Sequence, residues 1–361
     1  MPPVFAISVP IGAYHPLLRD CLASLAVQTP APRVALLDAS ADPRVAETAD
    51  EFGDLLAYRR HGPDKGQSDA ILEGWSKLGG DVLGWLNADD ALYPGALAAA
   101  AAALADENAD IVYGHAAIIN DDNAYTGYYW SVEPPSERLL WSDVIAQPSC
   151  FFRRAAYEKV GGLNAGLHYT MDWDLWVRLW RDGARFAFRD RVMSRVLWSP
   201  EAKTGGFGAA RRRELARIID QNASPAARVK SRIGFALNHL FEYVIPPGAA
   251  RAMRQRLAAD DDAIHGLGSN GDIRGEARLP IVHYGPAAVA AVRVVFSHTP
   301  AGDEVSADRR AATRREGKAV IAVFETPLAP AETAELQIRR PDNAESALVK
   351  IELIGETAGG V

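Results

Sequence analysis

The sequence contains few cysteines, no excess of basic residues and no long apolar run, and each shortage excludes a class of protein. Its two cysteines, Cys21 and Cys150, stand among apolar residues. This is typical of buried thiols in a reducing compartment and not of a disulfide framework or a zinc motif. The net charge of -7 at pH 7 argues against a nucleic-acid-binding protein. Because no segment is apolar for the length of a bilayer and the N-terminus shows no basic, apolar leader, we expect a cytoplasmic protein.

The first half of the chain also lacks two phosphate-binding motifs. Neither G-x-G-x-x-G nor G-x-x-x-x-G-K-[ST] follows any of the strands predicted there, which disfavours a dinucleotide-dependent dehydrogenase and a P-loop NTPase. What the chain does have is length. Its 361 residues exceed what one hydrophobic core usually organises, so we expect at least two domains.

The N-terminal half alternates short apolar runs with helical patterns. Four buried strands are predicted at 5–9, 34–37, 55–58 and 82–86, with helical spacing of apolar residues between them. This alternation predicts an α/β fold with a mostly parallel, Rossmann-like nucleotide-binding sheet and flanking helices. In such sheets ligands bind outside the carboxyl ends of the strands, so polar residues at those ends are candidate site residues.

The C-terminal half changes character twice. Two helices are expected near 208–221 and 226–245, and beyond a polar linker short β-type runs predict a small C-terminal β-sandwich. The predicted divisions are a first domain at 1–205, a helical extension packed on it at 206–259, a linker at 260–275 and a β-sandwich accessory domain at 276–361.

One stripe of the second helix is apolar, and we expect it to pack on the first domain. Its members are Val229, Ile233, Leu237, Leu240 and Val244. The basic residues around it suit either a solvated helical face or contact with anionic lipid. They are Arg211, Arg212, Arg213, Arg217, Arg228, Lys230 and Arg232.

Carboxylates follow three successive predicted strands. Asp38 closes the second strand, Asp64 follows the third, and the fourth ends in Asn87-Ala88-Asp89-Asp90. Carboxylate and amide oxygens suit Mg²⁺ or Mn²⁺ that holds a substrate's phosphates. The alternative for the last segment is a solvated turn that caps the helix beginning near Pro94. Three carboxylates at one sheet edge favour a site for a nucleotide and a metal.

These segments, in this order and spacing, resemble a family 2 glycosyltransferase of the GT-A fold, similar to those of bacterial cell-envelope polysaccharide synthesis. The resemblance covers about residues 4–205. It also rests on further segments: Asp64-Lys65-Gly66-Gln67-Ser68-Asp69-Ala70, Gln147-Pro148-Ser149, Gly161-Gly162-Leu163-Asn164 and Met171-Asp172-Trp173-Asp174. It implies an inverting, metal-dependent hexosyltransferase. Such an enzyme moves a sugar from a nucleotide diphosphate, UDP first, to a hydroxyl of a glycan or lipid-linked glycan.

The resemblance also implies roles for single residues. It implies Asp89, with Asn87, as ligand of Mn²⁺ or Mg²⁺, and Asp172 as the catalytic base. Gln147 and Trp173 fall at the acceptor pocket, although Trp173 also suits the core. The implied donor-binding residues are Pro10, Ile11, Asp38, Asp64, Lys65, Gln67, Asp69, Asn87, Ala88 and Asp90. From the local sequence alone, we expect Asp172 to be the N-cap of a helix and Asp174 to be a charged residue in its first turn.

The chain departs from the family pattern in three places. Ile11-Gly12-Ala13 stands where relatives carry Thr-x-Asn, Asn87 replaces a carboxylate, and Ser199 replaces a metal-binding His. These departures predict a weak or water-completed metal site. They keep open a catalytically weakened carbohydrate-binding or scaffold protein. A sugar nucleotidyltransferase is a further alternative, but it usually needs a glycine-rich phosphate loop after the first strand. The expected partners are a nucleotide sugar and a glycan or lipid-linked acceptor, and no nucleic acid is expected. If the basic residues around the apolar stripe contact anionic lipid, the protein is peripheral at the cytoplasmic face of the membrane.

Overall fold

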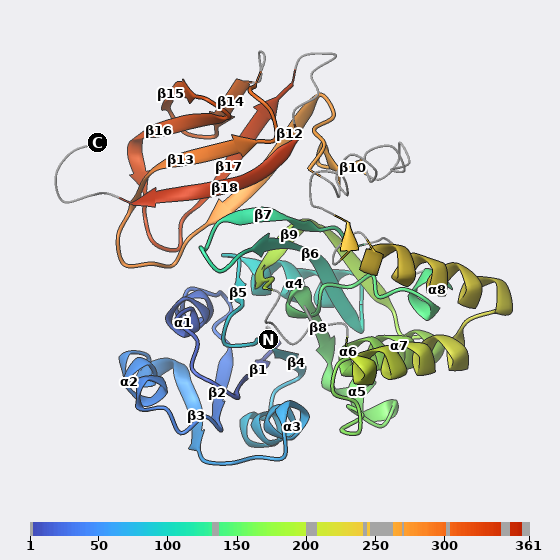
Figure 1. Cartoon of the computed structure of the whole chain (residues 1–361). Coiled ribbons are helices and arrows are strands. Elements are labelled where there is room, and N and C mark those ends of the chain that lie inside the picture. The colour runs from blue at the N-terminus through green and yellow to red at the C-terminus, as the bar shows by residue number, and fades with distance from the viewer. Residues whose placement is uncertain are drawn as a thin grey trace. The chain divides into compact units, whose positions relative to one another are not determined.

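The computed structural model describes residues 3–131, 137–199, 208–240, 244–245, 263–268, 271–300, 304–340 and 347–355. The chain divides into two compact units (Figure 1). The first unit consists of Met1–Ala116 and Trp130–Gly234, and the second of Ala117–Tyr129 and Phe235–Val361. Among the described residues, no helix is both long and apolar enough to cross a membrane.

The first unit is built on a mixed sheet whose first four strands are parallel, in the order β3-β2-β1-β4. Strand β8 continues the sheet antiparallel to β4, and β6 pairs antiparallel with β8. The strands are β1 (Phe5–Ile11), β2 (Arg33–Asp38), β3 (Leu56–His61), β4 (Val82–Trp85), β5 (Ala91–Leu92), β6 (Ile111–Ile119), β8 (Cys150–Arg153) and β9 (Phe186–Leu197). This arrangement confirms the predicted α/β class with a GT-A type sheet.

Helices flank this sheet (Figure 1). They are α1 (Leu18–Ala26), α2 (Pro43–Glu51), α3 (Gln67–Leu78), α4 (Ala96–Asp106), α5 (Arg154–Lys159), α6 (Met171–Arg181), α7 (Ala209–Asn222) and α8 (Pro225–His239). Short 3₁₀ turns occur at η1 (Gly53–Leu55), η2 (Glu137–Leu140) and η3 (Gln147–Ser149). Every residue of β1 is buried, as expected for a central strand covered on both faces.

A glycine sets the spacing between α3 and β1. A Cβ on Gly74 would lie 2.3 Å from Oγ of Ser8, so only glycine permits this approach. The Ser8 hydroxyl donates to the carbonyl of Ile71, 3.0 Å away. Because α3 is fixed against the central strand, its first residue, Gln67, is held at the carboxyl end of the parallel strands.

The second unit is an antiparallel β-sandwich. One of its sheets has the order β12-β17-β14, and the other contains the neighbours β15-β16-β13-β18-β7. Its strands are β7 (Tyr125–Tyr129), β10 (Ala263–Ile264), β11 (Leu267–Gly268), β12 (Glu276–Val282), β13 (Val289–Phe296), β14 (Glu304–Ala307), β15 (Ala311–Glu316), β16 (Ala319–Leu328), β17 (Thr333–Arg339) and β18 (Leu348–Gly355). The predicted small antiparallel sheet is therefore present. A G-x-G-x-x-G spacing at 266–271 overlaps the two-residue strand β11 of a hairpin, so it does not join a strand to a helix.

The sandwich includes a segment that the sequence prediction assigned to the first domain. Strand β7 pairs with β18 through Tyr125 and Ile351. The Tyr125 hydroxyl receives a hydrogen bond from the Val282 amide, 2.8 Å away, and Tyr128 donates to the Pro280 carbonyl at 2.8 Å. The burial of two tyrosines whose hydroxyls meet backbone groups explains why this segment belongs to the second unit.

The prediction that the apolar stripe of α8 packs on the first domain is wrong. Val229 is 59% exposed and Ile233 is 55% exposed. The helix instead buries Ser231, whose hydroxyl donates to the carbonyl of Trp141 at 2.7 Å. Ser231 lies on the side of the helix opposite to the stripe, so the apolar face is turned away from the contact.

Candidate donor and catalytic site

The carboxyl ends of the parallel strands bring the predicted donor residues to one edge of the sheet. Ile11, Asp38 and His61 are aligned across β1, β2 and β3, and Pro10 is aligned with Leu37. Pro10 and Ile11 are buried, and the carbonyl of Ile11 accepts a hydrogen bond from Ala39. These two residues therefore contribute their backbone, and not exposed side chains, to the carboxyl edge of the sheet.

Asp38 is buried at this edge, with 1% of its surface exposed. One of its oxygens lies 2.9 Å from Nδ1 of His61, and the other accepts from the amide and hydroxyl of Ser40 at 2.8 and 2.6 Å. The carboxylate is thus held in one orientation. Neither His61 nor Ser40 was among the predicted site residues, although both are polar residues at or just after a strand end.

Asp64 and Asp69 shape the loop between β3 and α3. The Asp64 carboxylate receives a hydrogen bond from the Gly66 amide at 2.9 Å and pairs with Nη2 of Arg60 at 3.0 Å. The Asp69 carboxylate accepts from the Lys65 amide at 3.2 Å, while Lys65 itself is exposed. Gly66 has a φ of 119°, a conformation that favours glycine. These hydrogen bonds constrain the backbone of the loop between β3 and α3.

A chain of side-chain hydrogen bonds crosses the acidic end of β4. Gln67 donates to the Asn87 oxygen at 2.7 Å, and the Asn87 amide group donates to Asp90 at 3.1 Å. The other Asp90 oxygen accepts from the backbone of Leu197 at 3.2 Å. Ala88, also a predicted donor residue, is 7% exposed between them. The Asn87 amide is engaged on both sides, which leaves Asp89 as the available carboxylate of this segment.

Both acids of the Asp89-Asp90 pair are harder to ionise than usual. Burial raises the pKa of Asp89, while its own amide and the charge of His15 oppose the rise. Burial raises the pKa of Asp90 well above its ordinary value, and the charge of Asp89 adds to the effect. Among the residues that the structure describes, only its own amide donates to the Asp89 carboxylate. His15 was not predicted, because one histidine in a loop gives no sequence signal.

The capping alternative for this segment is wrong. Helix α4 begins at Ala96, its N-cap is Gly95, and no side chain caps it. The carboxylates of Asp89 and Asp90 therefore do not cap that helix.

A second carboxylate pair joins Asp172 to Asp143. Burial, followed by the charge of Asp172, raises the pKa of Asp143 well above its ordinary value, and Arg211 opposes the rise. Asp172 lies in the first turn of α6, where it accepts from the Trp173 amide at 2.8 Å. It is not the N-cap, which is Thr170, so that alternative is wrong. Asp143 was missed because it is separated from Asp172 in sequence and matches no motif.

The neighbouring acid behaves differently. Asp174, in the same helical turn, pairs with Arg178 at 2.7 Å. This is the i,i+4 pair expected of a first-turn carboxylate on a helix surface. The pairing neutralises Asp174, so Asp172 is the better candidate for accepting a proton.

Helix α7 holds the loop that leads into α6. The Glu214 carboxylate accepts hydrogen bonds from the amides of His168 and Tyr169, at 2.9 and 2.8 Å. The Thr170 hydroxyl donates to the same carboxylate at 3.2 Å. Glu214 therefore fixes the backbone just before Asp172, a role that the sequence did not reveal.

The predicted acceptor residues lie on either side of this region. Gln147, in η3, donates to the carbonyl of Trp85 at 2.9 Å and so ties η3 to the end of β4. Trp173 is 1% exposed, and its indole donates to the Leu139 carbonyl at 2.7 Å. Trp173 was predicted either at the acceptor pocket or in the core, and the structure shows it in the core.

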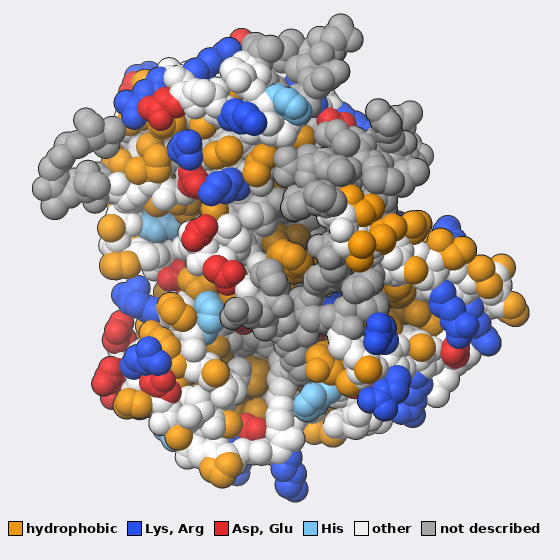
Figure 2. Space-filling model, in the orientation of Figure 1, with side chains coloured by type: hydrophobic (Ala, Val, Ile, Leu, Met, Phe, Trp, Pro, Cys, Tyr) orange, Lys and Arg blue, Asp and Glu red, His pale blue; other side chains and the backbone are white. Residues whose placement is uncertain are grey.

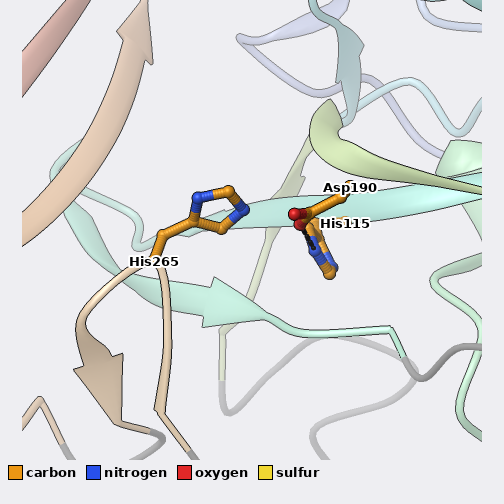
Figure 3. Close-up of side chains that lie close together, drawn as sticks. All are labelled: His115, Asp190 and His265. Carbon is orange, nitrogen blue, oxygen red and sulfur yellow. Dashed lines mark hydrogen bonds and ion pairs between the residues drawn. The ribbon is translucent and has the colours of Figure 1, made fainter.

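His115 and Asp190 form a separate pair in the first unit (Figure 3, which also draws His265 of the second unit). The Ser131 amide donates to Nδ1 of His115 at 3.0 Å, so Nε2 carries the proton and donates to Asp190, also at 3.0 Å. The imidazole is fully buried. Both ring nitrogens of His115 are therefore engaged in hydrogen bonds within the first unit.

Ser199 is buried at the position where the family pattern predicts a histidine. The following segment, Pro200 to Thr204, lies outside the described residues. The predicted replacement of a metal-binding histidine by a serine therefore stays a prediction about this site.

A recess of about 530 Å³ lies in the second unit, away from any of these residues in sequence. Its lining includes Arg339 and Arg314, which pair with Glu276 and Glu316 at 3.0 and 3.2 Å. Because its lining comes from antiparallel strands of the second unit and includes no residue at the carboxyl ends of the parallel strands, we do not assign it to the donor.

The sheet of the first unit, with carboxylates at the ends of its parallel strands, has the fold of a GT-A domain. Residues 8–161 match the sequence profile described as glycosyl transferase family 2. This part of the chain is therefore similar to family 2 glycosyltransferases, and the chain is a glycosyltransferase.

Curated relatives agree with this assignment. The chain is 26% identical over 260 residues to a "PGL/p-HBAD biosynthesis glycosyltransferase" of Mycobacterium bovis, covering 70% of this chain and 95% of that protein. A protein of the same name from Mycobacterium tuberculosis matches equally. These relatives favour glycosyl transfer over nucleotidyl transfer.

Two solved structures are also similar to the chain. Staphylococcus aureus TarS 1-349 in complex with UDP-GlcNAc has a TM-score of 0.48 at 14% identity, over 66% of this chain and 72% of that one. The mannosyltransferase PcManGT from Pyrobaculum calidifontis, in complex with GDP-Man and Mn2+, has a TM-score of 0.46 at 19% identity, over 72% and 77%.

Proposed function

We propose that this glycosyltransferase uses a divalent cation to transfer a sugar from a nucleotide diphosphate, UDP first, to a hydroxyl group with inversion. The observation that carries the proposal is the state of Asp89 at the end of β4. Asp89 is partly buried, its pKa is raised by burial, and among the described residues only its own amide donates to its carboxylate. A bound cation would favour the ionised form and relieve this cost.

The donor set fits Mn²⁺ or Mg²⁺. Asp89 supplies a hard carboxylate oxygen, and Asn87 supplies a neutral oxygen that already accepts from Gln67. We expect Asp89 to be the principal ligand and Asn87 the weaker one, with water completing the site. When bound, the cation stabilises the negative charge on the departing diphosphate.

The nucleoside is proposed to bind along the ends of β2 and β3. Asp38, oriented by His61 and Ser40, and Asp64, oriented by Gly66, present fixed carboxylates there. Such groups suit hydrogen-bond donors on a base and a ribose. We expect the exposed Lys65 to approach the diphosphate, Gln67 and Asp69 to hold the loop, and Asp90 to support the donor pocket.

Asp172 is proposed to deprotonate the acceptor. The charge of Asp172 helps to raise the pKa of Asp143, so ionisation of one of these two carboxyls disfavours ionisation of the other. In the reaction, the acceptor hydroxyl loses its proton to Asp172 as its oxygen bonds to the anomeric carbon. The bond from that carbon to the diphosphate breaks in the same step, and the nucleotide leaves with the electron pair.

The acceptor is proposed to be a glycan or lipid-linked glycan. This proposal is supported by the name of the Mycobacterium relatives, which assigns them to PGL/p-HBAD biosynthesis. We propose the cytoplasm as the place of action, because both cysteines are free and buried.

A thermal-shift screen of UDP, GDP and dTDP, each with and without Mn²⁺, tests the proposal directly. A ligand that binds only the folded state raises the melting temperature by mass action. We expect one diphosphate to raise it, and Mn²⁺ to enlarge the shift. A donor that binds without any transfer to glycan acceptors would favour the scaffold alternative, and no shift with any diphosphate would contradict the proposal.

A further inference from the structure

Helix α8 carries an apolar stripe that faces solvent. Seven large hydrophobic side chains are exposed in the part of the chain that the structure describes, and five of them fall between positions 229 and 244. Three lie on α8 itself: Val229, Ile233 and Leu237, exposed by 59%, 55% and 43%. Single exposed apolar residues need no explanation, but a cluster on one element usually marks an interaction surface.

Helical spacing places these side chains on one side of α8. Positions 229, 233 and 237 recur every four residues, so they fall within about a quarter of the helix circumference. Leu240, just beyond the helix end, continues the stripe and is 38% exposed. The contact face is elsewhere, because Ser231 is 4% exposed and bonds to Trp141.

Basic side chains surround the stripe. Helix α8 has Arg228, Lys230 and Arg232 and no acidic residue. On the same wheel, Lys230 falls on one side of the apolar residues and Arg232, which pairs with Asp220 of α7 at 2.8 Å, falls on the other. Helix α7 adds Arg212, Arg213 and Arg217, all exposed. Figure 2 shows hydrophobic side chains along α8 and Lys or Arg side chains over its flank and over α7. This basic region stands out in a chain whose net charge is -7.

We propose that the stripe of α8 docks on an anionic lipid surface, lying in the plane of the interface without crossing it. An apolar face flanked by Lys and Arg is the pattern of interfacial helices, in which the apolar side chains enter the acyl boundary and the basic ones contact lipid phosphates. The long basic side chains keep their charges in the headgroup layer while their stems cover apolar surface.

Charge distinguishes this occupant from a second copy of the chain. In a symmetric dimer the same patch meets itself, so the basic flanks of two α8 helices would face each other. Like charges across an interface disfavour such pairing. An anionic membrane supplies the opposite charge and an apolar interior together.

Flotation of the full chain with lipid vesicles tests this proposal without a sugar donor, so its failure is separate from failure of the proposed glycosyl transfer. The vesicles contain either phosphatidylcholine alone or about one phosphatidylglycerol in three lipids. We expect binding to the anionic vesicles at least about tenfold tighter than to the neutral ones, and weakening at high salt.

The matched variants are Ile233→Asp and Val27→Asp. Each places a carboxylate on an exposed apolar position, but Val27 lies after α1, away from α8 in sequence, and is 44% exposed. Ile233→Asp should reduce vesicle binding about tenfold or more, whereas Val27→Asp should leave it unchanged. Equal loss in both variants, equal affinity for neutral vesicles, or no binding of the wild type would overturn the proposal. So would a wild-type dimer that Ile233→Asp converts to a monomer, since the stripe would then cover a second copy.

Discussion

The first unit contains two pairs of carboxylates in which the pKa of an acid is raised, and we propose a different role for each pair. In both, burial raises the pKa of an acid and a second acid adds to the rise. Asp89 and Asp90 are adjacent in sequence at the end of a strand, and their carboxylate oxygens are ligands that suit a divalent cation. Asp143 and Asp172 come from different elements and meet beside Arg211, which suits retention of a proton. The first pair is proposed to serve the leaving group, and the second the acceptor.

The second pair is tested most severely by removing the proposed base. Asp172→Asn keeps the side-chain size but cannot take a proton, so sugar transfer should fall at least about a hundredfold. Donor affinity should stay at the wild-type value, because the proposed donor residues lie on other elements. Steady-state transfer and calorimetric donor binding measure the two effects.

Asp174→Asn is the matched control, since it removes an acid from the same helical turn. Loss of its partly exposed pair with Arg178 should cost about 0.5 kcal/mol of stability or less and leave transfer nearly normal. If Asp174→Asn were inactive and Asp172→Asn active, the proposed base would be assigned to the wrong residue.

Glu214 of α7 holds the backbone just before Asp172, so its substitution should lower the transfer rate less than Asp172→Asn does. Glu214→Gln exchanges one of the two oxygens that hold the loop for an amide, so the start of α6 should shift. We expect a loss of about tenfold in kcat with unchanged KM for the donor, because only the acceptor side is displaced.

Asp220→Asn on the same helix is the control, and it should leave both constants unchanged, since Asp220 pairs with Arg232 on α8. A Glu214→Gln enzyme that loses donor affinity and kcat together would point to general unfolding of the site.

Asp143→Asn should give the smallest change in rate and a diagnostic change with pH. Its raised pKa means that the folded state binds a proton more tightly than the unfolded state. The stability that this group contributes is therefore fully present below the ordinary pKa of the acid and is lost as pH rises through the raised pKa. Asn removes this penalty, so the variant should melt at a higher temperature than the wild type at neutral and alkaline pH, with the difference vanishing in acid.

The same substitution should move the acidic limb of kcat/KM to lower pH, because Asp172 loses a like-charged neighbour. Asp182→Asn, on an exposed pair with Lys159, should change neither profile. A limb that moves to higher pH would contradict the repulsion between the two acids.

The sequence predicted what local patterns and a family resemblance determine. Alternating strands and helices predicted the parallel sheet, and Asp38, Asp64 and Asp89 do lie at its carboxyl edge. What it missed depends on distant partners. Asp143 meets Asp172, and Glu214 meets the loop before α6, only after folding. No periodicity reports such contacts.

The apolar stripe of α8 shows a second limit of sequence patterns. A hydrophobic face at helical spacing is the same signal whether a neighbouring domain or a lipid surface covers it. Here the helix buries Ser231 through one hydrogen bond to Trp141, and the apolar residues face outward. Strand β7 was misassigned for a related reason, since its partner β18 lies at the other end of the chain.

The central claim is that Asp89 holds the cation that binds the donor diphosphate. Calorimetry of UDP with and without Mn²⁺, on the wild type, Asp89→Ala and the exposed control Asp50→Ala, tests it most directly. We predict that Mn²⁺ tightens UDP binding to the wild type and to Asp50→Ala, and that it has no effect on UDP binding to Asp89→Ala. If Asp89→Ala kept the full response to Mn²⁺, the cation would be held elsewhere and the assignment of this strand end would be contradicted.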